Sequence, residues 1–200
     1  MTYITHKRFA VWIALIGCMY LYTKGLQNIN YYLALIITIQ FSKAGALFPD
    51  VDHHWNSVKE KTAVNWVINK IIHLTGGKHR SWQTHSIDIV TVFCILCFIA
   101  PDYLLSKGFI GAVDKEILST VMIGFALGWV SHILADMLNG TGVRLFCWRR
   151  KMIAFVPKAI FGFRFKTGES WEGFVSTLTQ ALNVVAGLVA IAYPFILTRI

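Results

Sequence analysis

The sequence is poor in charge, and above all in acidic residues. Only 14% of its 200 residues are charged and only ten are Asp or Glu, whereas 56% are hydrophobic. The mean hydropathy is +0.56. Soluble domains usually carry about 25% charged residues, so this composition excludes an ordinary soluble domain and indicates an integral membrane protein.

Cysteine is also scarce, and its placement excludes a disulfide framework. Cys18, Cys94 and Cys97 lie within apolar segments, and Cys147 falls in a loop that we assign to the reducing cytoplasm. The Cys94-x-x-Cys97 spacing resembles a redox motif but lacks the strand-to-helix context that lowers a thiol pKa. We therefore assign the cysteines no functional role.

Long apolar segments dominate what the sequence does contain. Five have about the length of a membrane span: Phe9–Thr23, Tyr31–Leu47, Ile87–Leu105, Ile117–Leu138 and Phe174–Leu197. The first two are short for a span, so we expect them to be tilted, flanked by snorkelling lysines or only partly inserted. The sequence predicts an all-α fold, a polytopic helical membrane bundle of about five transmembrane helices, with four as the alternative, in a single domain over residues 1–200.

The basic residues predict the orientation of this bundle, because Lys and Arg are enriched in cytoplasmic loops. With the N-terminus in the cytoplasm and the C-terminus outside, all but four of the 19 Lys and Arg residues are cytoplasmic; the exceptions are Lys24, Lys107, Lys115 and Arg199. This bias accounts for the net charge of +9 without nucleic acid as a partner. The first segment follows Lys7 and Arg8, as in a signal peptide, but no small-residue cleavage site follows it, so we expect an uncleaved helix.

Two long loops are predicted on the cytoplasmic side. The first, Phe48–Ser86, contains apolar residues at helical spacing over Thr62–Leu74, and Gly76-Gly77 ends that helix. We expect it to lie along the membrane or over a site, with Lys61 and Lys70 toward water. The second, Asn139–Gly173, mixes cations with aromatic residues. It suits either insertion at the membrane surface or a hairpin packed on the bundle.

Ionisable residues that are unusual beside membrane spans all fall on the predicted cytoplasmic side, where they are costly and usually functional. They are His6, Asp50, Asp52, His53, His54, His79, His85, His132, Asp136, Glu169 and Glu172. The Lys and Arg residues alone set the topology, so this clustering is partly independent of it. The pattern predicts a metal site at a membrane surface.

The local spacing supports such a site. His132 and Asp136 are four residues apart on one helix, so both side chains face the same way and can bind one ion. Pro49 ends the preceding helix, and we expect a strand-like turn that aims Asp50 and Asp52 together, although either can simply cap a helix. Histidine and carboxylate ligands suit Zn²⁺, Mn²⁺ or Fe²⁺, and their number allows one or two ions. His54 and His73 are expected to be exposed.

Several short polar motifs occur in a fixed order along the chain. They are Thr5-His6, Leu47-Phe48-Pro49-Asp50-Val51-Asp52-His53, His79-Arg80 with Thr84-His85-Ser86, residues 127–136 ending in His132-Ile133-Leu134-Ala135-Asp136, and Thr167-Gly168 with Glu172. In these motifs the chain resembles the YdjM-like family of bacterial inner-membrane proteins, described as membrane-bound metal-dependent hydrolases. The resemblance implies a multi-pass protein of the bacterial cytoplasmic (inner) membrane. It also implies that a polar centre is formed by His6, Asp50, Asp52, His53, His79, His85, His132 and Asp136.

We predict hydrolysis of a phosphoester in a phospholipid or another amphiphile at the cytoplasmic membrane face. One or two divalent ions, Zn²⁺ or Mn²⁺, would be held by the eight residues, Arg80 would hold a phosphate oxygen, and Glu172 would orient or deprotonate water. The alternatives are a non-catalytic membrane scaffold with a structural metal and a small transporter. Membrane lipids are the expected partners, and the sequence leaves the oligomeric state open.

Overall fold

The computed structural model describes residues 2–23, 28–139, 141–149, 151–155, 159–160, 163–164 and 167–197. Seven helices and two short 3-10 helices lie within these ranges, and their order is α1 (Tyr3–Thr23), α2 (Tyr31–Leu47), η1 (Pro49–Asp52), η2 (Trp55–Ser57), α3 (Ala63–Leu74), α4 (Trp82–His85), α5 (Ile87–Ser106), α6 (Ala112–Met137) and α7 (Ser170–Leu197). Two-residue strands β1 (Ala159–Ile160) and β2 (Phe163–Arg164) pair antiparallel before α7. An all-α membrane bundle is confirmed.

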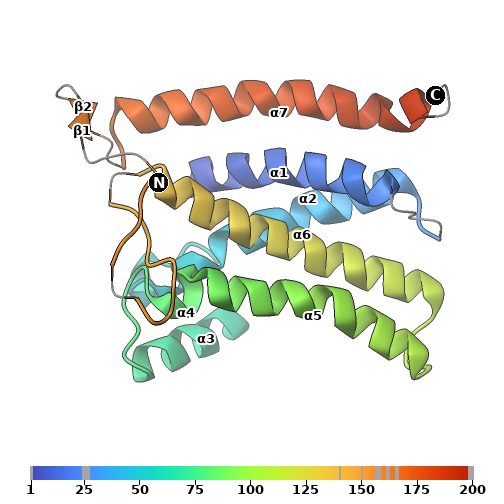
Figure 1. Cartoon of the computed structure of the whole chain (residues 1–200), viewed down its shortest axis with the longest axis horizontal. Helices are drawn as coiled ribbons and strands as arrows, with labels where there is room; N and C mark the ends of the chain where they lie inside the picture. Colours follow the sequence, from blue (N-terminus) through green and yellow to red (C-terminus); the bar gives the residue numbers. More distant parts are fainter. Residues whose placement is uncertain are drawn as a thin grey trace.

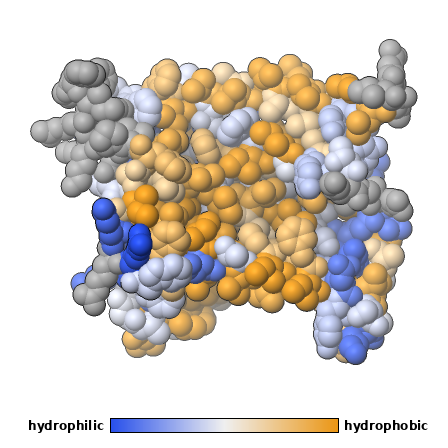
Figure 2. All heavy atoms as spheres, viewed as in Figure 1, coloured by the Kyte–Doolittle hydropathy of each residue, from blue (hydrophilic) through white to orange (hydrophobic). Residues whose placement is uncertain are grey.

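The long helices α1, α2, α5, α6 and α7 lie side by side and form the bundle (Figure 1). Helix α6 packs against α1, α2 and α5, while α7 lies at the edge on α1. On the face shown in Figure 2, hydrophobic residues cover the middle of the bundle, and hydrophilic residues gather toward its two ends. This distribution is that of a helical bundle in a bilayer, because lipid-facing surface must be apolar.

Among the described residues, four helical segments are long and apolar enough to cross a membrane: Tyr31–Asp52, Ile87–Ser106, Ala112–Met137 and Ser170–Leu197. Each matches a predicted span. Helix α1 is not in this set, although its 21 residues would be about 30 Å long and it lies within the bundle. His6, Lys7 and Arg8 in its first turns lower its apolar character. The fifth span therefore stays a prediction.

The helix boundaries follow from short polar residues at the N-caps. The side chain of Asn30 accepts a hydrogen bond from the backbone of Tyr32, that of Thr62 accepts one from Asn65, and that of Ser86 accepts one from Ile89. The predicted helix over Thr62–Leu74 is thus confirmed as α3, with Thr62 as its cap.

The sequence Pro49–Asp52 forms a 3-10 turn, so the expected strand-like turn was wrong.

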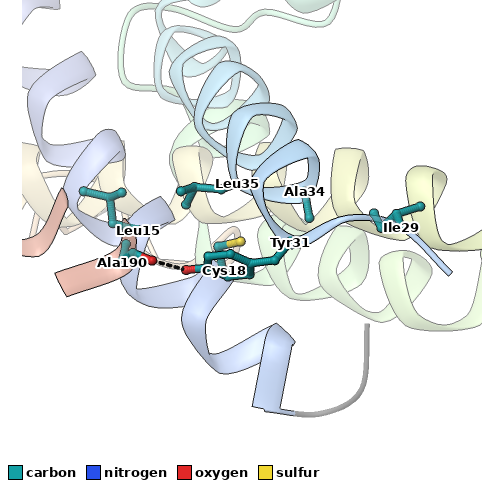
Figure 3. Close-up of a cluster of buried hydrophobic side chains, with 7 residues drawn as sticks. All are labelled: Leu15, Cys18, Ile29, Tyr31, Ala34, Leu35 and Ala190. Atoms are coloured by element: carbon teal, nitrogen blue, oxygen red, sulfur yellow. Dashed lines mark hydrogen bonds between the residues drawn. The ribbon is translucent and has the colours of Figure 1, made fainter. Parts of the chain in front are cut away.

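One apolar cluster joins α1, α2 and α7 far from the polar loops (Figure 3). Tyr31 packs among Leu15, Cys18 and Leu35, and its hydroxyl donates to the carbonyl oxygen of Ala190 at 2.9 Å. This bond satisfies a buried phenol and a helix carbonyl together.

All four cysteines are free.

Part of the sequence-based argument falls outside the described residues. Those positions are Lys24, Gly140, Arg150, Lys158, Phe161, Phe165, Lys166 and Arg199. In the described part of the second long loop, Val143 and Ile153 form an antiparallel bridge, and Val143 is fully buried. Phe155 and Trp148 are exposed. The loop thus packs partly on the bundle and keeps exposed aromatic rings.

Candidate metal centre

The predicted polar residues meet at one end of the bundle, where α1 begins, α2 runs into η1, α4 precedes α5, and α6 ends (Figure 1). Two groups of side chains there are spaced so that each can hold one ion. Within each group, the candidate ligand atoms lie within 4.8 Å of one another; the groups are His6 with His132 and Asp136, and Asp50 with His53 and His79.

The first group is fully buried. His6 Nε2 lies 3.4 Å from Asp136 Oδ1, and the His6 ring stacks on the His132 ring with centroids 3.8 Å apart. The i, i+4 spacing on α6 places His132 Nε2 3.8 Å from Asp136 Oδ2. The predicted pairing of His132 and Asp136 is therefore seen in the geometry, and α1 supplies the third group.

The second group is more exposed and owes its form to the 3-10 turn. In a 3-10 helix, residues i and i+3 lie above one another, and Asp50 Oδ1 accordingly lies 3.6 Å from His53 Nε2. The His53 ring stacks on that of His79, with centroids 3.6 Å apart. Partial burial, with the nearby imidazole of His79, holds the pKa of His53 below its usual value. This favours the neutral form, which can bind metal.

Asp52 lies apart from Asp50 and faces two histidines. Its Oδ1 is 3.2 Å from His79 Nδ1, and its Oδ2 is 3.2 Å from His85 Nδ1. The same carboxylate accepts hydrogen bonds from the Ser81 backbone N–H at 3.1 Å and the Thr84 hydroxyl at 2.6 Å. Asp52 is completely buried. In metal sites, a carboxylate on Nδ1 orients an imidazole so that its Nε2 can bind the ion, and Asp52 is placed to orient His79 and His85 in this way.

A close helix crossing fixes the orientation of His132. Its Nδ1 lies 2.6 Å from the carbonyl oxygen of Ala46 on α2. A carbonyl oxygen only accepts, so Nδ1 carries the proton and Nε2 keeps the lone pair. The crossing is close because Gly128 on α6 faces α2: a Cβ atom there would lie 1.9 Å from the Ser42 carbonyl oxygen.

His85 lies between the two groups. Its ring is completely buried, and its Nε2 is 3.8 Å from Asp136 Oδ2. The groups are further joined by His132 Nε2, which lies 3.8 Å from Asp50 Oδ1. All eight histidine and aspartate residues predicted for the polar centre thus lie in one connected cluster.

Arg80 reaches the same cluster from the turn before α4. Its Nη2 donates to Asp136 Oδ2 at 3.0 Å, and its Nη1 donates to the carbonyl oxygen of Gly142 at 3.0 Å and to the Thr141 hydroxyl. Arg80 has a φ of +61°, a backbone conformation that is uncommon outside glycine. The surrounding contacts therefore hold its side chain over Asp136 at some conformational cost.

Glu172 lies beside the cluster without lining it. Its carboxylate accepts hydrogen bonds from the Thr5 hydroxyl at 2.8 Å, from the Gly168 backbone N–H at 2.7 Å and from the Thr2 backbone N–H. These contacts tie the first turn of α1, and so His6, to the start of α7. Glu169, also predicted near the site, is exposed.

Two cavities meet at Asp50 and His53. One, of about 210 Å³, is lined by His6, Asp50, His53, His79, Arg80, Asp136 and Thr167. The other, of about 660 Å³, is lined by Thr2, Tyr3, Ile4, Asp50, His53, Asn56, Ser57 and Lys59. The two candidate groups therefore border a space large enough for part of a small molecule.

Sequence reasoning missed Asn69, a polar residue that holds the ligand-bearing turn in place. Asn69 on α3 donates to the carbonyl oxygens of Val51 at 2.5 Å and His53 at 2.8 Å. Helix α3 also carries the polar residues Asn65, Lys70 and His73, so no signal in the sequence singled out Asn69. His54 and His73 are exposed, as predicted.

Comparisons with known proteins agree with the membrane architecture. A family model described as YdjM inner membrane protein matches residues 1–199. The Inner membrane protein YdjM of Escherichia coli (strain K12) and that of Shigella flexneri are each 34% identical to the chain over 116 residues. The aligned region covers 56% of this chain and 51% of each relative, so the chain spans about half the length of the curated relatives it matches. No solved structure matches it.

Proposed function

The chain belongs to the YdjM family of inner membrane proteins, and from that premise we propose that it is a membrane-bound metal-dependent hydrolase of a phosphoester in an amphiphile. One observation carries the proposal. The cavity lined by both groups of histidine and aspartate side chains shares Asp50 and His53 with a cavity of about 660 Å³. A substrate headgroup in the larger space would lie beside the ligands.

The residues present fit a divalent metal. Within the described residues, the buried nitrogen atoms His6 Nδ1, His85 Nε2 and His132 Nε2 have no hydrogen-bond partner. Unpaired buried polar atoms are costly, and a cation would satisfy lone pairs that face it. Histidine and carboxylate donors without thiolates suit Zn²⁺ or Mn²⁺, and two groups of three allow one or two ions.

A bound divalent cation would polarise a phosphoryl oxygen and lower the pKa of a water molecule. Overall, hydrolysis adds the oxygen of water to phosphorus, breaks the bond from phosphorus to the alcohol oxygen, and gives that oxygen a proton. Arg80 lines the cavity and has a buried Nε–H without a partner. Its guanidinium can therefore bind a phosphate oxygen while it holds Asp136.

The other residues contribute by position. Asp52 keeps His79 and His85 in one orientation through their Nδ1 atoms, which supports a ligand shell. Glu172 has three hydrogen bonds and does not line the cavity. We therefore propose that it anchors α1, and with it His6, in place of the proton-transfer role that the sequence suggested.

The main alternative is a non-catalytic scaffold in which a metal joins α1, η1, α4 and α6. The convergence of four elements on one cluster favours this alternative. A transporter is less well supported, because in that class the ionisable groups lie near the membrane midplane. Here they gather at one end of the bundle.

The test uses detergent-solubilised protein and chromogenic p-nitrophenyl phosphodiesters with short and long alkyl chains. We expect about one or two bound Zn²⁺ or Mn²⁺ ions per chain, with turnover that falls under chelator and returns with metal. His132→Ala and Asp136→Asn should lose metal and activity. The matched control Asp102→Asn removes a carboxylate that pairs with Lys115 at 2.9 Å outside the site, and it should change neither.

Two outcomes contradict the proposal in different ways. Full metal occupancy without turnover on either chain length would favour the scaffold. Wild-type protein that neither retains nor takes up Zn²⁺ or Mn²⁺ would refute the metal site itself.

A further inference from the structure

Helix α3 contacts the candidate site through two side chains, the buried Asn69 and the exposed His73, whose Nε2 lies 3.3 Å from the carbonyl oxygen of His53. Asn69 is 2% exposed, and its amide donates to the carbonyl oxygens of Val51 and His53. These two carbonyls belong to the turn that carries Asp50, Asp52 and His53. Any force that positions α3 therefore also positions this ligand-bearing turn.

The outward side of α3 is apolar. Val64, Val67, Ile71 and Leu74 recur at helical spacing and form one stripe, which we call the α3 stripe. Their exposed fractions are 66%, 48%, 55% and 85%. An exposed apolar stripe of this kind indicates contact with a membrane or with another protein surface. The lateral surface of the bundle already faces the membrane.

Lysines flank this stripe. Lys61 precedes α3, Lys70 lies within it with its ammonium 5.8 Å from the Trp66 ring, and Lys78 follows it; all three are exposed. The nearby acid, Glu60, pairs with Lys7 at 3.9 Å. An apolar stripe with flanking cations and a tryptophan is the pattern of a helix at a membrane surface, where cations meet anionic headgroups.

The position of α3 in the fold is consistent with this. It lies at the same end of the bundle as α4 and the start of α5, on the side away from α7 (Figure 1). That end carries the loops and hydrophilic residues, so α3 lies where the apolar surface gives way to the polar end.

We propose that α3 is a membrane-interface helix that rests on anionic lipid through the α3 stripe and holds the ligand-bearing turn through Asn69. The membrane is the one in which the bundle itself is embedded. Lipid contact thereby stabilises the turn that carries Asp50, Asp52 and His53, so this turn should be better ordered in a bilayer than when α3 lacks its lipid contact. This inference stands whether or not the site hydrolyses a substrate.

The position of α3 can be measured with spin labels on a cysteine-free chain in nanodiscs that contain phosphatidylglycerol. Labels replace Val67 and Ile71 in the stripe, and His73 on the opposite exposed side. Leu188→Cys on α7, where the side chain is 66% exposed, gives the lipid reference, and Lys107→Cys gives the water reference. Accessibility is read with oxygen, which concentrates in lipid, and with a water-soluble nickel chelate.

We expect labels at positions 67 and 71 to behave like the label at 188, and the label at 73 to behave like the label at 107. Labels at 67 and 71 that the nickel chelate reaches as readily as it reaches 107 would place α3 in water. Labels shielded from both reagents would indicate a protein contact, such as a second copy of this chain. Either result overturns the proposal.

Coupling to the turn is tested by hydrogen exchange of residues 50–58 in the same nanodiscs. Asn69→Ala removes the two buried hydrogen bonds of the link and leaves the His73 contact in place, and Val67→Asp removes the apolar contact with lipid; each should raise exchange in this segment several-fold. In Asn69→Ala, a label at position 71 should keep its lipid accessibility. Unchanged exchange in Asn69→Ala would refute the link, and unchanged exchange in Val67→Asp alone would refute its dependence on lipid.

Discussion

The close crossing of α2 and α6 predicts that Gly128→Ala will disrupt the metal centre without touching it. A Cβ atom at Gly128 would lie 1.9 Å from the carbonyl oxygen of Ser42 and 2.8 Å from the backbone nitrogen of Ala46. Both are backbone atoms, so no side chain can rotate away. Ordinary contact begins at 3.4 Å, so the two helices must separate by ~1.5 Å to relieve the overlap.

That separation has two energetic consequences. Overpacking of this kind costs about 1 to 3 kcal/mol. A shift of similar size would also break the 2.6 Å hydrogen bond from His132 Nδ1 to Ala46 and leave a buried N–H unpaired, at about 1 to 3 kcal/mol more. The total is about 2 to 6 kcal/mol, and His132 Nε2 would no longer be held toward Asp136.

The assay is thermal unfolding in detergent, together with competition for Zn²⁺ against a chelating dye. We expect Gly128→Ala to lower both the melting temperature and the metal affinity. Gly187→Ala on α7 is the matched control, because a Cβ there meets nothing within 4 Å; it should be neutral or slightly stabilising. Equal melting and equal metal affinity in the two variants would refute the role assigned to the crossing.

Three further predictions concern the site and the topology. A reporter fused at the N-terminus should be cytoplasmic and one at the C-terminus external, because the basic residues favour an odd number of spans; both ends on one side would exclude five. Asp52→Asn should weaken metal affinity about 10- to 100-fold, since His79 and His85 lose their orienting carboxylate. Turnover should also fall at saturating metal, and turnover equal to that of the wild type under this condition would contradict the role of Asp52. Glu172→Gln should lower metal affinity, because it loosens the contacts that position His6, and it should leave the pH dependence of any turnover unchanged. A shifted pH profile would instead support the proton-transfer role that the sequence suggested for Glu172.

Much of the architecture could be predicted from the sequence because it depends on local pattern. Low charge and apolar segments of spanning length predict helices in a membrane, since a backbone in lipid must satisfy its own hydrogen bonds. Apolar spacing predicted a helix over Thr62–Leu74, and α3 (Ala63–Leu74) differs from it by one residue. The i, i+4 spacing of His132 and Asp136 places both side chains on one face of α6, because residues four apart are neighbours on a helix surface.

Only the tertiary structure could divide the eight predicted ligands into groups. Asp50 and Asp52 were expected to point together, but a 3-10 turn has three residues per turn, so Asp50 pairs with His53 while Asp52 turns to His79 and His85. Two of the partners of Glu172, Thr2 and Thr5, lie about 170 residues away in the chain. Such contacts depend on how closely the helices pack. Residues such as Gly128 set that distance, and a glycine in the sequence does not indicate which side chains its close packing will position.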